Sequence, residues 1–423
     1  MTRAAIAAAA AFLCLATSAR AAFTPAWRSV VVPPGLTPPA ADRQGPLLAV
    51  LDTPVDGAHP AFAGSNLVAP PVAVRDAHGT AMASIAVAVW PGIRVMVVPL
   101  PEPVTCAASA EAIRQAVAAR ASVISMAYGS SAICASEWVQ SQFAIAADSL
   151  LVAAAGNGRD PRQYPAAGED VLAVGAVDLS GRSSADSAAG PHIDLAAPGV
   201  GLLAAAPAGF ETDGTPDGYH AVSGTGAATT IVAALATWLR AARPELATDQ
   251  VASLLRLTAR DVEEPGRDDE TGWGEPRIQS ALVGTAPVAD HAEPNDNIAW
   301  IDGRLLAPAP RVWSGGPARA LTARLRRHED VVDVYSIRIP ARRAARVTLT
   351  PRWGNANLSA YDQGTFSVAD TTGLIARAPR RSGTEELIVD NARPRPRTIL
   401  LAIRIDPSAA QDGAGYWLRV AEH

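Results

Sequence analysis

The sequence predicts an α/β domain, in which a mostly parallel sheet has helices on both faces, followed by a small all-β sandwich. Two observations predict the first part: short apolar runs alternate with helical stretches from Leu47 to about Gly284, and these runs are apolar on both faces, as expected of buried strands. A third predicts the sandwich, because short alternating runs separated by turn signals follow Gly284. A chain of 423 residues is long enough for two or three units, each with its own core.

The elements of the α/β part follow in order along the chain. The expected strands are short, apolar and rich in β-branched residues, and they cover residues 47–51, 94–100, 123–127, 150–154 and 171–174. The expected helices cover residues 108–119, 137–147 and 225–242, the last of them ended by Arg243-Pro244. Sites in such sheets form at the carboxyl ends of the strands, where Asp52 and Asn157 are placed.

The first residues are typical of an export signal. Arg3 precedes an apolar stretch, and Ala19-Arg20-Ala21 provides a cleavage site with small residues. A membrane anchor is the alternative, but the uncharged run is shorter than the roughly 20 residues that a span needs, and no later segment reaches that length. We expect a periplasmic or extracellular protein. Its units are a signal peptide over 1–21, an N-terminal extension over 22–46, the α/β domain over 47–285, a linker over 286–317 and the sandwich over 318–423.

The last third of the chain differs from the rest in its pattern of expected strands and in its charge. Its expected strands cover residues 333–339, 345–349, 386–389, 398–405 and 416–420. Residues 289–423 carry 19 Arg against 15 acidic residues, while the whole chain has a net charge of −5. This excess is small and lacks interleaved aromatic residues, so the composition does not support nucleic-acid binding.

Two cysteines, Cys106 and Cys134, remain once Cys14 of the predicted signal is set aside. In an oxidising compartment two cysteines predict one disulfide, with two separate buried thiols as the alternative. Neither has a Cys or His nearby at ligand spacing, which argues against a zinc site.

Three polar positions stand out within the α/β part. Asp52 ends an apolar run and precedes Thr53, and His78 opens an expected helix as His78-Gly79-Thr80. Asn157 follows Ala154-Ala155-Gly156. Taken singly, each has an ordinary explanation as a turn, cap or surface residue. Together, an acid, an imidazole and an amide are three of the parts that a serine hydrolase uses to activate a nucleophile and stabilise an oxyanion.

The fourth part, the nucleophile, is missing. Residues 223–230 read Ser-Gly-Thr-Gly-Ala-Ala-Thr-Thr, with Gly226 where the order Asp, His, nucleophile places the attacking serine. Glycine has no side chain, so it can neither attack a substrate nor give a proton to His78. The hydroxyls of Ser223 and Thr225 are expected to point elsewhere, because they lie three residues and one residue before this position.

With these motifs, residues 47–282 resemble the subtilisin-like (S8, subtilase) serine peptidase family. The resemblance implies that Asp52 holds the histidine, that His78 is the general base and that Asn157 is the oxyanion-hole amide. It also implies substrate binding through the strand Ser125-Met126-Ala127-Tyr128-Gly129 and through Ala154 and Gly156, which would pair with an extended peptide. The departures from the family pattern are Pro54, Ala81, Ser84, Gly226, Ala227 and Thr230. Structural calcium is common in the family, but no ligands can be assigned in this sequence.

The C-terminal unit resembles the bacterial pre-peptidase C-terminal (PPC) domain. The residues that carry this resemblance are Glu293-Pro294-Asn295-Asp296-Asn297 and the closing Gly415-Tyr416-Trp417-Leu418-Arg419-Val420. Such a domain implies a role in binding or in solubility during export, without chemistry of its own.

The leading hypothesis is an exported pseudoprotease, a catalytically impaired homologue that binds extended peptide or protein segments in a retained cleft. Two alternatives stay open. One is an active serine-type endopeptidase with a displaced nucleophile, and the other is a structural or partner-binding protein whose cleft is a relic.

Overall fold

The computed structural model describes residues 23–158, 163–168, 171–287, 295, 300–301, 304–305, 309–326, 332–365, 368, 371–379, 383–406 and 413–423. The predicted signal peptide and part of the predicted linker lie outside these residues, so the domain boundaries stay predictions. Within this part of the chain, no helix is both long and apolar enough to cross a membrane.

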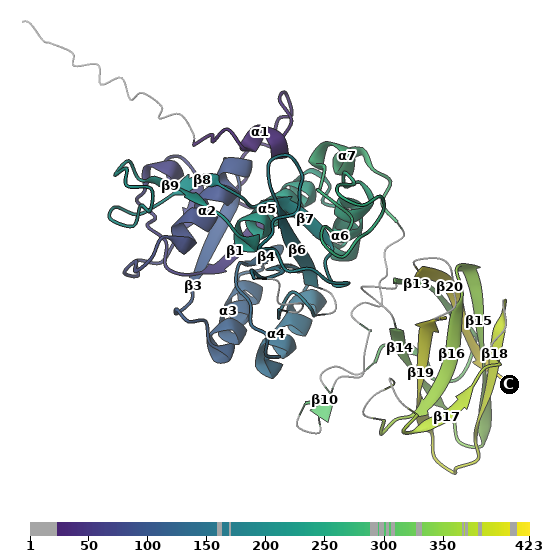
Figure 1. The fold of residues 1–423 in the computed structure, drawn as a ribbon. Coiled ribbons are helices and arrows are strands. Elements are labelled where there is room, and N and C mark those ends of the chain that lie inside the picture. The colour runs from purple at the N-terminus through teal and green to yellow at the C-terminus, as the bar shows by residue number, and fades with distance from the viewer. Residues whose placement is uncertain are drawn as a thin grey trace, which may run out of the picture.

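The first part is an α/β domain on a parallel sheet, as predicted (Figure 1). The sheet has seven strands in the order β2-β3-β1-β4-β5-β6-β7. They are β1 (Leu47–Asp52), β2 (Asn66–Val68), β3 (Arg94–Pro99), β4 (Val123–Met126), β5 (Leu150–Ala154), β6 (Val171–Val177) and β7 (Leu195–Pro198). Because β1 lies between β3 and β4, in register with both, its carboxyl end is at the middle of the sheet edge.

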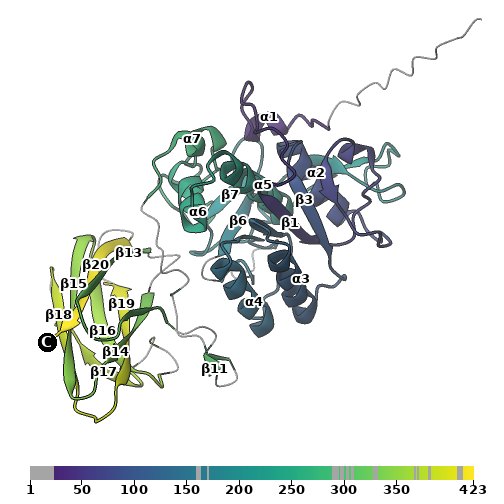
Figure 2. The same cartoon turned by 180° about the vertical axis from the view of Figure 1, so that it is seen from behind.

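Helices cover both faces of this sheet. They are α2 (His78–Val89), α3 (Cys106–Ala118), α4 (Ala135–Ala146) and α5 (Thr225–Ala242), with the shorter α1 (Arg28–Val31), α6 (Thr248–Leu257) and α7 (Ile278–Val283) and the 3₁₀ turn η1 (Pro60–Phe62). Figures 1 and 2 both show α3 and α4 side by side on one face, with α2 and α5 on the other. Alternate residues of β1 face opposite layers: Leu48 and Val50 pack with α2 and α5, and Ala49 packs with α3 and α4.

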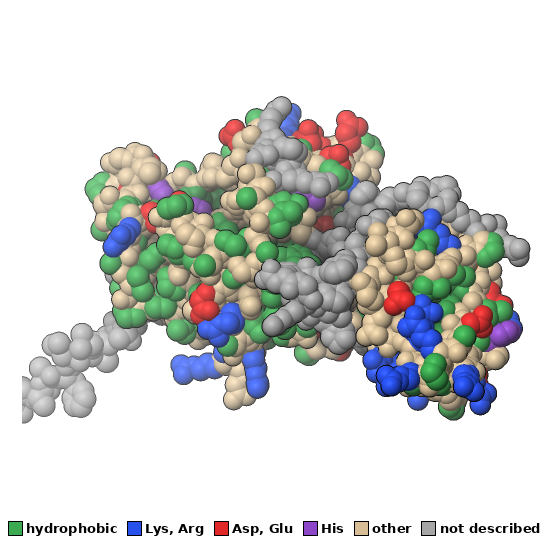
Figure 3. Space-filling model, turned by 90° about the horizontal axis from the view of Figure 1, so that it is seen from below, with side chains coloured by type: hydrophobic (Ala, Val, Ile, Leu, Met, Phe, Trp, Pro, Cys, Tyr) green, Lys and Arg blue, Asp and Glu red, His purple; other side chains and the backbone are tan. Residues whose placement is uncertain are grey.

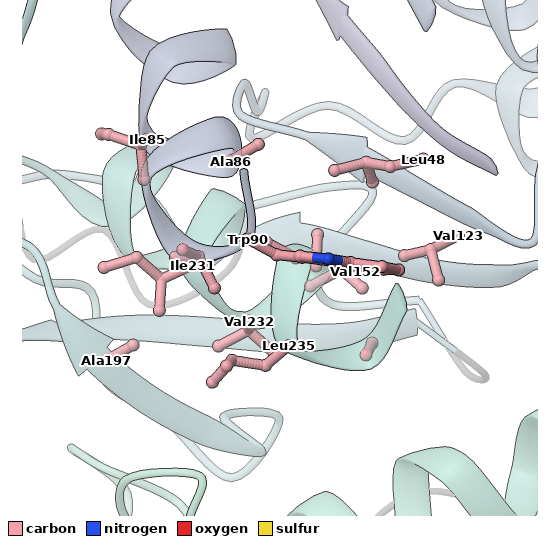
Figure 4. Packing of buried hydrophobic residues seen from close by; sticks show 14 of the residues in the cluster. Leu48, Ile85, Ala86, Trp90, Val123, Val152, Ala197, Ile231, Val232 and Leu235 are labelled. Carbon is pink, nitrogen blue, oxygen red and sulfur yellow. The ribbon is translucent and has the colours of Figure 1, made fainter. Parts of the chain in front are cut away.

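The layer against α2 and α5 is the larger core. Helix α5 is buried from Thr225 to Leu239, which explains why its sequence is apolar all round. Figure 4 shows Ile231, Val232 and Leu235 of this helix pointing into a cluster with Trp90, at the end of α2, and with side chains of the sheet. This packing fixes the first turn of α5, which carries Gly226, against the sheet.

Several elements were not predicted. The antiparallel hairpin of β8 (Leu202–Ala205) and β9 (Tyr219–Val222) lies beside the main sheet, and its short strands mix buried and exposed positions.

Helix α4 begins at Ala135, two residues before the predicted start, because the Sγ atom of Cys134 accepts the backbone N–H of Glu137 and caps the helix.

The second part consists of two β-sheets, as predicted, and their strand pairs are antiparallel except for β12 with β14, which is parallel. A five-stranded sheet has the order β12-β14-β19-β16-β17, and a four-stranded sheet has the order β13-β20-β15-β18. The strands are β12 (Arg311–Trp313), β13 (Arg319–Arg326), β14 (Val332–Ile339), β15 (Arg343–Trp353), β16 (Ala356–Asp362), β17 (Leu374–Arg377), β18 (Glu385–Asn391), β19 (Arg397–Ile405) and β20 (Gly413–Glu422), and a separate pair is β10 (Trp300–Ile301) with β11 (Arg304–Leu305). Their inward-facing residues form one core. Figure 3 shows Arg side chains gathered on one face of this sandwich.

The predicted disulfide between Cys106 and Cys134 is present, with the two Cα atoms 5.6 Å apart. It joins the first residue of α3 to the residue that caps α4. It therefore ties the two helices together at their amino-terminal ends.

Removing this disulfide is expected to destabilise the α/β domain. The bond closes a loop with a sequence separation of 28 residues, and loops of this length typically contribute about 3 kcal/mol. The free energy of unfolding should fall by about that amount in Cys106→Ser/Cys134→Ser, measured by urea denaturation against the oxidised parent. Equal denaturation midpoints for the two proteins would contradict the expectation.

Candidate active site

Asp52 and His78 meet at the carboxyl end of β1, an inner strand of the sheet. Asp52 is the last residue of β1 and is buried, while His78 is the first residue of α2. The Nδ1 atom of His78 lies 2.7 Å from Oδ1 of Asp52. Gly79 permits this approach, because a Cβ at that position would lie 2.0 Å from the carbonyl oxygen of Thr53. The structure thus brings together the acid and the imidazole that the sequence analysis singled out.

Asp76 orients the start of α2, and the sequence analysis did not find it. Its Oδ1 atom accepts hydrogen bonds from the backbone N–H of His78, at 2.8 Å, and from the hydroxyl of Thr53, at 2.6 Å. The Thr53 hydroxyl oxygen in turn accepts the N–H of Gly79, at 2.9 Å. An Asp that accepts the backbone N–H two residues further on forms an Asx turn, a local pattern that the sequence could have suggested.

The charge of Asp52 controls the imidazole. Attraction to this carboxylate is the largest effect and raises the pKa of His78 to about 9, although burial acts in the opposite direction. The hydrogen bond to Asp52 and the charges of Asp76 and Glu102 raise the pKa further. The Oδ2 atom of Asp52 has no hydrogen-bond partner among the described residues, so His78 is the main group that compensates the buried carboxylate.

Stability is therefore expected to depend on pH through His78. A His whose pKa is raised in the folded state adds stability that is complete below its unfolded value, near 6.5, and is lost as the pH rises through about 9. Because the side chain is 48% exposed, solvent screening should limit the loss to about 1 kcal/mol. Urea denaturation from pH 6 to 10 should show this decline in the parent but not in Asp52→Asn, and an equal decline in both would argue against it.

Gly226, the second residue of α5, leaves an unfilled position opposite the imidazole. A Cβ built on it would lie 3.5 Å from Nε2 of His78 and 3.2 Å from the Cβ of Ala127. An oxygen attached there would be within hydrogen-bond reach of Nε2. The acid and the imidazole are therefore aligned toward a position at which this chain has no side chain.

The neighbouring hydroxyls are engaged elsewhere. Ser223 Oγ accepts the N–H of Gly201 at 3.0 Å. Thr225 is buried, and its hydroxyl donates to Oδ1 of Asn157 and accepts the N–H of Gly156, both at 3.1 Å. Neither residue presents its hydroxyl to His78.

Asn157 lines the same cleft as His78 and Gly226, beside the residues that precede Gly226. Its Oδ1 atom also accepts the backbone N–H of Thr225, at 2.9 Å, so the amide is held with Nδ2 next to Gly224. Among the described residues Nδ2 has no acceptor, and Asn157 is exposed. This geometry leaves an N–H group available to a ligand in the cleft.

These groups line a cleft with a volume of about 640 Å³. Of the residues expected to bind substrate, five line the cleft: Ala127, Tyr128, Gly129, Ala154 and Gly156. Ser125 and Met126 do not, because both are fully buried within β4, where Met126 packs in the core beneath α3 and α4. Only the segment that follows β4 is open to the cleft.

The sequence analysis also missed His220, which lines the cleft from β9. Its Nδ1 atom lies 3.3 Å from the hydroxyl of Thr212, and its Nε2 atom is buried without a partner in the described part of the chain. Burial lowers the pKa of this imidazole, which favours its neutral form. No sequence motif includes His220, and the residue pattern of Tyr219–Val222 does not predict a strand.

Metal binding was left open by the sequence analysis. Across the residues that the structure describes, no group of three or more His, Cys, Asp or Glu could hold a metal ion.

Comparison with known proteins identifies the family. A family model described as Peptidase_S8, the subtilase family, matches residues 43–274, which is more than half of the chain. The chain belongs to the subtilase family. A halolysin-like extracellular serine protease, Nep, of Natrialba magadii is 38% identical over 137 residues, covering 32% of this chain and 23% of that protein. Mycosin-4 of Mycobacterium tuberculosis is 31% identical over 194 residues, covering 40% of this chain and 41% of that protein.

A solved structure is similar over the same part. A mutant of the protease domain of PatA is 30% identical, with a TM-score of 0.51, and the match covers 57% of this chain and 95% of that chain. The matches to curated relatives span less than half of those proteins' own length. Membership of the subtilase family thus covers the α/β domain.

Proposed function

We propose that this subtilase homologue is exported, lacks efficient peptidase activity and holds extended peptide segments in its cleft. One observation carries the proposal: the position 3.5 Å from Nε2 of His78 belongs to Gly226 and carries no side chain. Without a nucleophile, the Asp52–His78 pair has no proton to take from an attacking group. The only chemistry left to it is weak activation of water.

Binding an extended peptide does not require the nucleophile that catalysis requires. The segment Ala127–Gly129 continues from β4 along the cleft, which residues 221–224 also line. An extended peptide can pair with such a segment through main-chain hydrogen bonds. The exposed amide of Asn157 adds a donor for a peptide carbonyl.

Two further features complete the proposal. Export is supported by the sequence of residues 1–21 and by the similarity to an extracellular protease. The C-terminal sandwich is proposed to be a PPC-like domain, supported by its two mostly antiparallel sheets and its closing strand β20.

Incubation with casein and with a fluorophosphonate probe tests the loss of activity. We expect neither robust cleavage nor covalent labelling. Labelling that mass spectrometry locates at Ser223 or Thr225 would instead establish the alternative of a displaced nucleophile.

Peptide binding should be lost when the cleft is blocked. Ala221 is exposed and lines the cleft, so Ala221→Arg places a long side chain in it. Fluorescence anisotropy with unfolded peptides should show affinity about tenfold or more weaker for this variant, because the peptide must displace the added side chain. Ala119→Arg, at an exposed position after α3, is the matched control and should bind as the parent does. If the parent protein binds no peptide detectably, the result would favour the alternative of a structural or partner-binding protein whose cleft no longer binds peptides.

A further inference from the structure

A second, smaller pocket adjoins the cleft. It has a volume of about 140 Å³ and is lined by residues of the α3 and α4 starts, together with Tyr128, Gly129 and Tyr164. Tyr128 and Gly129 also line the main cleft, so the two hollows are neighbours that share this part of the wall. At about 30 Å³ for each water, the pocket has room for one long side chain and not for a separate ligand of ordinary size.

A buried carboxylate is built into this pocket. Glu137, in the first turn of α4, lines it and is only 6% exposed. Its Oε2 atom accepts the Ser109 hydroxyl at 2.5 Å, and Ser109 Oγ lies 2.7 Å from the hydroxyl of Tyr128. Since the Ser109 proton is used by Glu137, Tyr128 must donate to Ser109. The network thus connects the carboxylate with the wall of the cleft.

Glu137 lacks a cationic partner. Among the residues described, no Arg or His forms an ion pair with it, and none donates a hydrogen bond to Oε1. Burial raises the pKa of this carboxyl, which is the effect expected of a carboxylate without a compensating positive charge. Its position at the start of a helix offsets part of the cost of keeping it ionised.

We propose that the Glu137 pocket takes a basic side chain, Lys or Arg, of the peptide held in the cleft. An ammonium or guanidinium group would supply the charge that Glu137 lacks and donate to its free oxygen, while the aliphatic stem packs against the apolar rim formed by Val104 and Ile133. This inference rests on the proposed function and specifies the class of peptide. The chain would select segments with a basic residue at one fixed position.

A peptide panel tests the pocket. Each position of a capped hexapeptide carries Lys, norleucine or Glu in turn, and affinities are measured by anisotropy. At one position, Lys should bind about tenfold more tightly than norleucine, and Glu should bind more weakly still. Glu137→Gln should abolish this preference while leaving the affinity of the norleucine peptide unchanged. Glu111→Gln, which removes an exposed carboxylate on the neighbouring helix α3, should retain the preference.

The outcomes separate the two proposals. Binding of all peptides without a preference for Lys, or a preference that persists in Glu137→Gln, overturns the Glu137 inference alone. No binding of any peptide overturns the proposed function and this inference with it. If Glu137→Gln does not fold, Ile133→Lys provides the same test, because it adds a cation at a rim residue that is 69% exposed and should remove the preference.

Discussion

Gly226→Ser is expected to give the chain serine hydrolase activity. The new Cβ would lie 3.5 Å from Nε2 of His78, so a rotamer of Ser can place Oγ in hydrogen-bond contact with an imidazole already held by Asp52. Loss of the nucleophile in subtilisin costs about 10⁶-fold in turnover, which sets the upper limit of the gain. We expect an increase of at least about a thousandfold in kcat/KM, because one oriented nucleophile restores most of that difference when its partners are in place.

The contacts around residue 226 determine how much of this maximum gain in turnover Gly226→Ser achieves. The same Cβ would lie 3.2 Å from the Cβ of Ala127 and 3.3 Å from its carbonyl oxygen, so Ala127, in the segment after β4, must move by a few tenths of an ångström. Gly226→Ala provides the control, because it adds the Cβ without the hydroxyl and should remain inactive. The measurements are hydrolysis of a chromogenic peptide and labelling by a fluorophosphonate. An inactive, unlabelled and folded Gly226→Ser would show that the site is damaged beyond the missing hydroxyl.

The sequence was sufficient for the parts of the site that local chemistry fixes. Asp52 could be placed because it ends an apolar strand, and His78 because His-Gly-Thr opens a helix. Their pairing follows from strand topology, since both positions lie at the carboxyl edge of one parallel sheet. The disulfide could be predicted because only two cysteines, Cys106 and Cys134, follow the predicted signal peptide.

The remaining parts of the site depend on tertiary contacts that no local pattern shows. Ser125 and Met126 belong to the motif that lines the cleft, yet they are buried because β4 lies between two packed layers. His220 lines the cleft from β9 of the β8–β9 hairpin, an element that the sequence did not predict. Glu137 looks like an ordinary helix residue in the sequence, and its place in a pocket lined by α3, α4 and the segment after β4 is visible only in the structure.

Asp52→Asn in the Gly226→Ser protein is expected to remove most of the restored activity. Asp52 accepts from Nδ1 of His78 and so holds the ring with Nε2 directed at position 226. An amide at this position can hold the wrong tautomer, and the corresponding change in a serine protease triad lowers kcat by about 10⁴-fold. The plateau of kcat/KM should fall by a similar factor, about 10³- to 10⁴-fold.

The pH profile of the same pair of proteins distinguishes this role from simple structural damage. The imidazole must be neutral to act as a base, so the activity of Gly226→Ser should rise with pH toward the His78 pKa of about 9. Loss of the Asp52 charge removes the largest cause of the raised His78 pKa. In the variant with Asp52→Asn, activity should therefore rise at a lower pH, and the plateau of kcat/KM should also be lower. Asp213→Asn, an exposed change on the β8–β9 loop, should alter neither quantity. A lower plateau with an unshifted rise would mean that Asp52 supports the fold without controlling the imidazole.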